Sequence, residues 1–150
     1  MLTSASNKSI KNVQDLLSKA KERKKQGVFV VEGPKMSFEA PYDWVSAVYM
    51  SESFFNDDRF KEEKKRFIDK TEIVSDSVFK SMSDTQTPQG VLAVVKMPHY
   101  DIDELFKGDK TELLVLESIQ DPGNLGTMVR TGEGAGVSGI IMNRTTVDIF

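Results

Sequence analysis

The residue types best suited to chemistry gather between Asp121 and Arg130. Asp121 and Asn124 favour the start of a helix, where each can present a polar side chain. Gly123 and Gly126 lack a Cβ, so the backbone can come close to a ligand at these positions. Arg130 lies six residues beyond Asn124, and its long side chain can reach back toward that amide. A guanidinium in this place suits a bidentate grip on a phosphate.

Two predicted strands flank these residues. Residues 113–116 and 139–142 are short apolar runs typical of buried strands, and the helix expected between them makes a βαβ unit. Six of the ten glycines fall between Gly123 and Gly139, and Gly136 is expected to end the helix. Ligands of open α/β sheets bind at the carboxyl ends of strands, where this loop begins. The loop is therefore the predicted site.

Two generic glycine motifs do not account for this loop. Residues 134–139 match G-x-G-x-x-G, but a dinucleotide fingerprint follows a strand and opens a helix, whereas this run ends a helix and opens a strand. No Walker A sequence is present, so an ATPase or GTPase has no support. A nucleotide-binding βαβ protein of another kind remains an alternative.

The first 97 residues alternate helices with strands, which predicts an α/β layer fold. The expected strands cover residues 28–31, buried on both faces, and 44–50, 72–74 and 91–95; the expected helices cover 8–26, 35–40 and 57–69, with a fourth that begins at Ser75 or Asp76. Residues 98–110 are polar and predict a linker with one helical turn. The predicted division is a domain at 1–97, a linker at 98–110 and an incomplete second domain at 111–150.

Composition narrows the class of protein. The chain has 150 residues, of which 39% are apolar and 29% charged, a mixture typical of a soluble globular protein. There is no cysteine and one histidine, His99, which excludes disulfides, cysteine-based metal sites and multi-histidine metal sites. No apolar run is long enough to span a membrane, and the N-terminus lacks a signal-peptide core. We therefore expect a cytoplasmic protein without a membrane partner.

Charge is distributed unevenly along the chain. The net charge is −3, yet residues 1–28 hold seven Lys and Arg against two acidic residues, so they carry +5 and the rest of the chain −8. A basic face on an acidic body is a candidate footprint for phosphate, although a solvated helix face would have the same composition. The candidate contacts are Lys11, Lys21 and Arg23.

Residues 121–131, which read Asp-Pro-Gly-Asn-Leu-Gly-Thr-Met-Val-Arg-Thr, resemble the first motif of the SpoU/TrmH family of RNA 2′-O-ribose methyltransferases. Asn124, Gly126 and Arg130 stand at the spacing of that motif. Members of the family use S-adenosylmethionine and have a knotted catalytic domain. One departure is Gly132, where the family usually has alanine, and a glycine there weakens a helix by about 1 kcal/mol.

The N-terminal part carries a second resemblance. Asn7, Lys11 and the runs at 21–23, 29–33 and 88–93 look like the substrate-binding domain that precedes the catalytic domain in many family members. That domain is similar to kink-turn-binding ribosomal proteins and has an α/β/α fold. The two resemblances cover nearly the whole chain. They imply a small α/β/α RNA-binding domain followed by the first βαβ unit of a knotted methyltransferase domain.

The resemblance also implies roles for single residues. Asn124 would shape the catalytic site, and Arg130 would help to remove the proton of a ribose 2′-OH. A guanidinium stays protonated at ordinary pH, so Arg130 is better suited to clamp the adjacent phosphate and stabilise the developing alkoxide than to act as a base. The family's second and third motifs are absent from the 150 residues. The S-adenosylmethionine pocket is therefore expected beyond residue 150, which leaves this chain inactive alone.

The implied function is S-adenosylmethionine-dependent 2′-O-methylation of structured RNA, contacted through Lys11, Lys21 and Arg23, with ribosomal RNA favoured over transfer RNA by family analogy. The alternatives are a transfer-RNA ribose methyltransferase and a non-catalytic module in which residues 1–97 grip a kinked RNA. The strands near residues 112–119 and 139–143 would form an incomplete sheet whose open edge seeks another chain. We expect an oligomer, a swapped arrangement or a disordered C-terminus here, and a homodimer through the complete catalytic domain.

Overall fold

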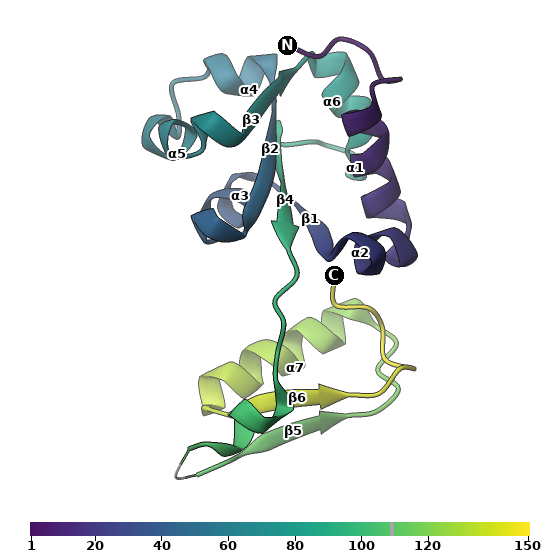
Figure 1. Ribbon diagram of the computed structural model, residues 1–150, viewed down its shortest axis with the longest axis vertical. Helices are drawn as coiled ribbons and strands as arrows, with labels where there is room; N and C mark the ends of the chain where they lie inside the picture. The colour runs from purple at the N-terminus through teal and green to yellow at the C-terminus, as the bar shows by residue number, and fades with distance from the viewer. Residues whose placement is uncertain (109) are drawn as a thin grey trace. The chain divides into compact units, whose positions relative to one another are not determined.

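A computed structural model describes residues 1–108 and 110–150 of the chain (Figure 1). The chain divides into two compact units: unit 1 holds residues 1–97 together with Phe150, and unit 2 runs from Pro98 to Ile149. Asp109, which falls in the predicted linker, lies outside the described residues. The sheet of unit 1 has four strands and that of unit 2 has two.

The sheet of unit 1 is mixed, with the strand order β1-β4-β2-β3. β4 is antiparallel to both of its neighbours, whereas β2 and β3 are parallel. Helical segments connect β2 to β3, as a parallel pair requires. The strands are β1 (Val28–Glu32), β2 (Val45–Ser51), β3 (Thr71–Val74) and β4 (Val91–Lys96).

Helices cover both faces of this sheet. α1 (Lys8–Ser18) and α6 (Asp76–Met82) enclose one apolar cluster with Leu92 and Val94 of β4. α3 (Pro34–Glu39) and α4 (Glu52–Asn56) enclose a second cluster with Val91, Ala93 and Val95 of the same strand. The two groups of helices lie on opposite sides of the strands in Figure 1. The expected α/β/α layers are confirmed.

The helix predicted over residues 8–26 is divided in two. α1 ends at Ser18, Lys19 takes an extended backbone conformation, and α2 (Ala20–Gln26) follows. Ile10, Val13 and Leu16 of α1 are fully buried, but α2 has no buried residue. The apolar face that would hold one continuous helix on the sheet therefore stops within α1, so the single-helix prediction was wrong.

The helix predicted over residues 57–69 is also shorter than expected. α4 ends at Asn56, Phe60 has a left-handed backbone with φ of 57°, and α5 (Lys61–Arg66) begins after it. A 3₁₀ turn at Ile68–Lys70 then leads into β3. Only the middle of the predicted helix is correct. The carboxylate of Asp57 accepts hydrogen bonds from the backbone N–H and from Nε of Arg59, and these bonds form a turn before α5.

β1 is less buried than its all-apolar sequence predicted. It is an edge strand that pairs with β4 alone among the named strands of the described chain. Val28, Phe29 and Val30 are half-buried, and Val31 is buried. β4 is buried on both faces along residues 91–95, because it occupies an inner position and has a helix layer on each side.

Unit 2 contains the predicted βαβ crossover. β5 (Leu113–Leu116) and β6 (Gly139–Met142) are parallel, and α7 (Pro122–Ala135) connects them. The segment predicted as a linker contributes a 3₁₀ helix, η3 (Ile102–Phe106), whose Leu105 side chain packs against Gly139. Residues on both sides of Asp109 thus pack within unit 2, while the division into two domains and a linker stays a prediction.

Two glycines explain how α7 lies on this sheet. A Cβ at Gly132 would come within 3.2 Å of Val137 Cγ2 and 3.4 Å of Leu114 Cδ2. The glycine that departs from the family pattern therefore lets α7 approach the strands closely. Gly136 has φ of 79° and donates its N–H to the carbonyl of Glu133, which confirms that it ends the helix.

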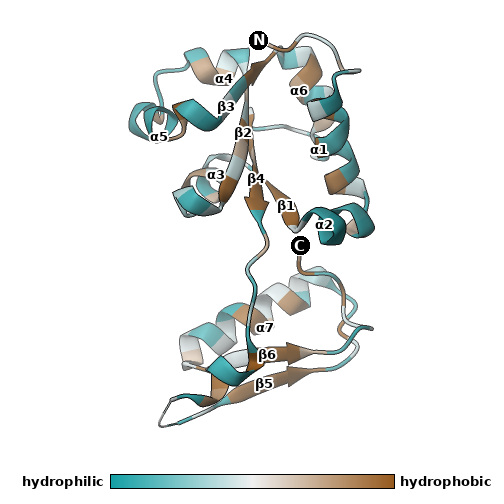
Figure 2. Cartoon of the chain, viewed as in Figure 1, coloured by the Kyte–Doolittle hydropathy of each residue, from teal (hydrophilic) through white to brown (hydrophobic). Residues whose placement is uncertain are grey.

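The distribution of hydropathy follows these layers. Figure 2 shows hydrophobic colour along β1, β4, β5 and β6, and hydrophilic colour along α2 and α5. Of the helices within residues 1–108 and 110–150, none combines the length and apolar character that a bilayer span requires.

Gly90, at the start of β4, leaves no space for a side chain. Its φ is +83°, and a Cβ there would lie 2.7 Å from Cβ of Phe54 and 2.9 Å from Oγ of Ser51. We expect Gly90→Ala to lower the free energy of unfolding by about 2–4 kcal/mol, because the strain of positive φ adds to overpacking. Urea unfolding followed by the fluorescence of Trp44 measures this loss.

Gly27→Ala is the matched control. Gly27 has φ of +64°, but no atom lies within 4 Å of its Cβ position. This variant should lose about 1–2 kcal/mol from backbone strain alone. Equal losses in the two variants would mean that Phe54 and Ser51 move aside freely, and would contradict the close approach.

Candidate functional site

The predicted loop caps α7. Oδ1 of Asp121 accepts a hydrogen bond of 2.6 Å from the backbone N–H of Asn124, and Pro122 occupies the first turn of the helix. Both choices suit a helix start, since a carboxylate satisfies a free N–H and a proline lacks one. Asn124 is exposed at the mouth of the helix. The structure thus gives Asp121 the capping role and leaves the side chain of Asn124 available to a ligand.

Arg130 folds back toward the start of α7. Its Nη2 donates to Oγ1 of Thr127 at 3.3 Å, and its Nη1 lies 3.4 Å from the position that a Cβ at Gly126 would take. Oγ1 of Thr127 in turn donates to the carbonyl of Gly123. The missing side chain at Gly126 therefore gives the guanidinium its place along the helix, and the reach of Arg130 to Asn124 stays a prediction.

Thr127 was not selected from the sequence. The sequence pointed to Thr127 only through its position three residues before Arg130, since residues at that spacing are neighbours on a helix surface. Arg130 and Thr127 are both exposed, so the guanidinium is accessible to an anion. The arrangement can hold a phosphate beside a hydroxyl at the helix mouth.

The side of α7 near β6 borders a pocket of about 720 Å³ within unit 2. Leu125, Val129, Ile140 and Met142 are among its mostly apolar lining, which also includes Arg130. Val129 and the neighbouring Ile149 are exposed despite their apolar character. The pocket is therefore an apolar surface next to the candidate site.

The basic N-terminal residues divide into two kinds. Lys11 on α1 and Lys21 on α2 are exposed, so both can meet a phosphate. Arg23 is half-buried, and its Nη1 donates to the carbonyls of Leu16 and Leu17 at 2.9 and 3.2 Å. These carbonyls belong to the last turn of α1, whose acceptors have no partner within the helix. Arg23 thus has a structural role that the sequence did not suggest.

Comparison with known families assigns the chain. Residues 7–93, more than half of the chain, match the protein family described as "MRM3-like substrate binding domain". The chain belongs to the SpoU/TrmH family of RNA methyltransferases. The matched residues all lie in unit 1, and residues 121–131, which resemble the first motif of the catalytic domain, lie in unit 2.

Individual relatives agree with this family. The chain is 32% identical over 150 residues to the 23S rRNA (guanosine(2553)-2′-O)-methyltransferase RlmP of Bacillus subtilis, covering 99% of this chain and 56% of that protein. It is 27% identical to the human mitochondrial rRNA methyltransferase 3, covering 94% of this chain and 34% of that protein. The chain therefore spans about half or less of the length of these SpoU/TrmH relatives.

A solved structure supports the fold of both units. The crystal structure of an AdoMet-bound rRNA methyltransferase from Sinorhizobium meliloti matches with a TM-score of 0.80 at 25% identity, over 99% of this chain and 56% of that one. The expected fold class, an α/β/α domain followed by a βαβ unit of a SpoU methyltransferase domain, is confirmed.

The capping role of Arg23 leads to a stability prediction. Arg23→Ala should lower the free energy of unfolding of unit 1 by about 1–3 kcal/mol, because two carbonyls of α1 lose a charged donor. Trp44 fluorescence during urea unfolding measures the change. Lys21→Ala is the control, since Lys21 is exposed on the same helix, and it should leave the midpoint unchanged. Unfolding of Arg23→Ala at the wild-type urea concentration would argue against a capping role.

Proposed function

We propose that this chain forms part of an enzyme that transfers a methyl group to a ribose 2′-OH of structured RNA. The observation that carries the proposal is the arrangement at the start of α7, where Arg130 lies back over Gly126 toward the mouth that Asn124 occupies. Asp121 holds this helix start in place. The match to a substrate-binding domain and the rRNA methyltransferases among the relatives support the same activity.

The residues present act on the RNA side of the reaction. The guanidinium of Arg130 clamps the phosphate next to the target ribose and stabilises the negative charge that grows on the 2′-oxygen. It acts as an electrostatic clamp, since a guanidinium does not give up its proton at ordinary pH. Asn124 orients the ribose through its amide, which has both a donor and an acceptor. Thr127 holds the guanidinium through its hydroxyl oxygen.

The pocket beside α7 does not fit the methyl donor. S-adenosylmethionine has a cationic sulfonium and polar adenosine and amino-acid groups, whereas the pocket beside α7 is mostly apolar and has Arg130 and Asp148 as its charged side chains. A cation at Arg130 would repel the sulfonium. We place the donor site in the part of such proteins that this chain does not span, in line with the 56% of RlmP that it covers.

The proposed substrate is ribosomal RNA, because the named relatives from Bacillus and human mitochondria are rRNA methyltransferases. We propose the cytoplasm as the compartment, where a chain without cysteine has no need of an oxidising environment. We also propose a homodimer through the completed catalytic domain. Val115 and Phe106 of unit 2 are 68% and 56% exposed, which supports further packing on this unit.

Arg130 provides the direct test of the proposed activity. Protein expressed from the complete reading frame that contains these residues should incorporate labelled methyl groups from S-adenosylmethionine into unmodified ribosomal RNA. Arg130→Gln should lower the rate by about 100-fold or more, because a donor to the developing oxyanion is lost. Arg130→Lys should retain an intermediate rate, since it keeps the charge and loses the bidentate grip.

Arg144→Gln is the matched control, because Arg144 is another exposed arginine of unit 2, and it should react at the wild-type rate. Residues 1–150 alone should transfer no methyl group in the same assay. Full activity of Arg130→Gln would exclude the clamp, and methylation by residues 1–150 alone would exclude a donor site outside this chain.

The basic helices provide a separate test of RNA capture. Binding of structured RNA to residues 1–150 should weaken as salt rises, because lysines displace counterions from phosphates. Lys11→Gln and Lys21→Gln should each reduce the steepness of log affinity against log salt by about 1, the amount expected for one lost phosphate contact. Lys65→Gln on α5 is the control for loss of one exposed charge. A slope that the Lys11 and Lys21 variants leave unchanged would remove these helices from the RNA interface.

A further inference from the structure

Unit 1 contains a hollow of about 770 Å³ whose lining includes no residue of the basic helices α1 and α2. Its walls come from the start of α3 at Pro34, the segment from Ser51 to Phe60 that contains α4, one side of α6, and the loop before β4. The charged residues of its lining are Asp57, Arg59, Asp76 and Lys80, whose formal charges sum to zero. A lining without net charge does not attract a phosphate, so the shape of the hollow and its specific contacts must decide what binds.

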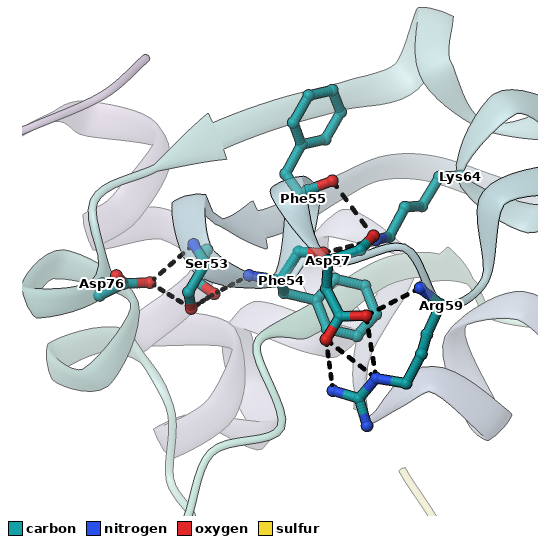
Figure 3. Close-up of polar contacts among 8 residues, drawn as sticks. Ser53, Phe54, Phe55, Asp57, Arg59, Lys64 and Asp76 are labelled. Carbon is teal, nitrogen blue, oxygen red and sulfur yellow. Dashed lines mark hydrogen bonds and ion pairs between the residues drawn. The ribbon is translucent and has the colours of Figure 1, made fainter.

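A buried lysine fixes the wall between α4 and α5 (Figure 3). The side chain of Lys64 is buried, and its Nζ donates to the carbonyls of Phe54, Phe55 and Asp57 at 2.5, 3.3 and 2.6 Å. Burial lowers the pKa of Lys64 from its ordinary value. One ammonium thus satisfies the end of α4 and the first residue of the following turn, which gives this turn a single conformation.

The same turn holds an arginine in one orientation. Both carboxylate oxygens of Asp57 accept from Nε of Arg59, at 3.0 and 2.9 Å, and Oδ2 lies 2.7 Å from Nη2 (Figure 3). The side-chain hydrogen bond from Arg59 lowers the pKa of Asp57 to about 2, so the pair stays ionised at neutral pH. The Arg59 side chain is nevertheless 72% exposed. Its planar guanidinium is therefore held beside the hollow with a face available for stacking.

Phe60 follows in a backbone conformation that is unusual for its type. Its φ of 57° is left-handed, and the residue is 37% exposed. Its ring centroid lies 5.8 and 6.0 Å from those of Phe38 and Phe54. A bulky residue with positive φ is strained, and such strain persists where the surroundings impose it and tends to mark functional sites. Here it places an aromatic ring, packed on two others, at the wall of the hollow.

The lining of the hollow also includes an amide, Gln89. Oε1 of Gln89 lies 3.2 Å from the position that a Cβ at Gly33 would take, so the Gln89 side chain rests on the turn before α3. Glu32 accepts hydrogen bonds from Ser83 and Thr85, which secures the beginning of the same loop. The loop before β4 is therefore held at both ends, and it presents a group that can both donate to and accept from a base.

We propose that this hollow binds one unstacked nucleotide of the RNA substrate. Phe60 and the Arg59 guanidinium offer surfaces on which a base can stack, and Gln89 offers hydrogen bonds to its edge. The occupant is argued from two observations: the hollow lies wholly inside residues 7–93, which match a substrate-binding domain, and its lining is neutral in sum. A paired helix hides base edges that this lining would contact, so the hollow selects an unpaired nucleotide.

The inference rests on the proposed function for its choice of RNA, and it assigns a different contact from that of Lys11 and Lys21. The lysines would provide affinity that depends on salt and is indifferent to pairing. The hollow would provide preference for an unpaired base with little dependence on salt. The two contributions can therefore be measured separately in one chain.

The experiment compares two labelled RNA hairpins that differ in a bulge of unpaired nucleotides, by fluorescence anisotropy with residues 1–150. The unaltered chain should prefer the bulged hairpin. Phe60→Leu should reduce that preference by about tenfold, because one stacking surface is lost. Gln89→Ala should also reduce it, because the hydrogen bonds to the edge of the base are lost. Both variants should keep the wild-type salt slope, because neither removes a charge. Circular dichroism establishes that each variant is folded.

Lys65→Gln is the matched control, since it changes an exposed residue near Phe60 that does not line the hollow, and it should keep the preference for the bulge. Gln89→Ala decides the matter if Phe60→Leu fails to fold, because Gln89 is exposed. Two outcomes would overturn nucleotide binding in the hollow and leave the proposed function standing. One is an unchanged preference in the folded variants, and the other is equal binding of both hairpins by the unaltered chain. If the unaltered chain binds neither hairpin, the RNA substrate of the proposed function falls with it.

Discussion

The burial of β4 on both faces is the constraint on which unit 1 depends. Alternate residues of this strand enter two different apolar clusters, one under α1 and α6 and the other under α3 and α4. Side chains of a strand point alternately to opposite faces, so a shift of one residue would exchange the two sets. The strand must therefore keep its register against β1 and β2 at once, and this fixes the loops at its start.

The sequence was informative where one pattern determined one structure. The alternating helices and strands, the βαβ unit around α7 and the end of that helix at Gly136 all follow from periodicity and helix-ending residues, and the structure agrees. Asp121 was one of two residues expected to cap α7, and it forms the hydrogen bond. Local signals were sufficient in these cases because the interactions themselves are local.

The sequence was misleading where distant contacts decide. Periodicity could not reveal that the helix is interrupted at Lys19 and that its second half has no buried residue. Nor could it reveal that the Arg23 guanidinium donates to a carbonyl at the end of α1. An apolar run at residues 28–31 could not show that β1 stands at an edge, since strand order is a tertiary property. The helical pattern through Phe60 and Lys64 hid the turn before α5, because a buried ammonium among carbonyls resembles a surface lysine in sequence. The catalytic roles of Asn124 and Arg130 and the RNA contacts of Lys11, Lys21 and Arg23 stay predictions.

Gly90 and Gln89 are neighbours under opposite constraints. The first has a left-handed backbone pressed against Phe54, and the second has an exposed side chain on the turn at Gly33. With the role proposed for Gln89, a change of RNA target would alter the side chain at position 89, while position 90 keeps the geometry of the strand that follows. Divergence in what the domain recognises would then be separate from divergence in how it folds, and the two could be inherited separately.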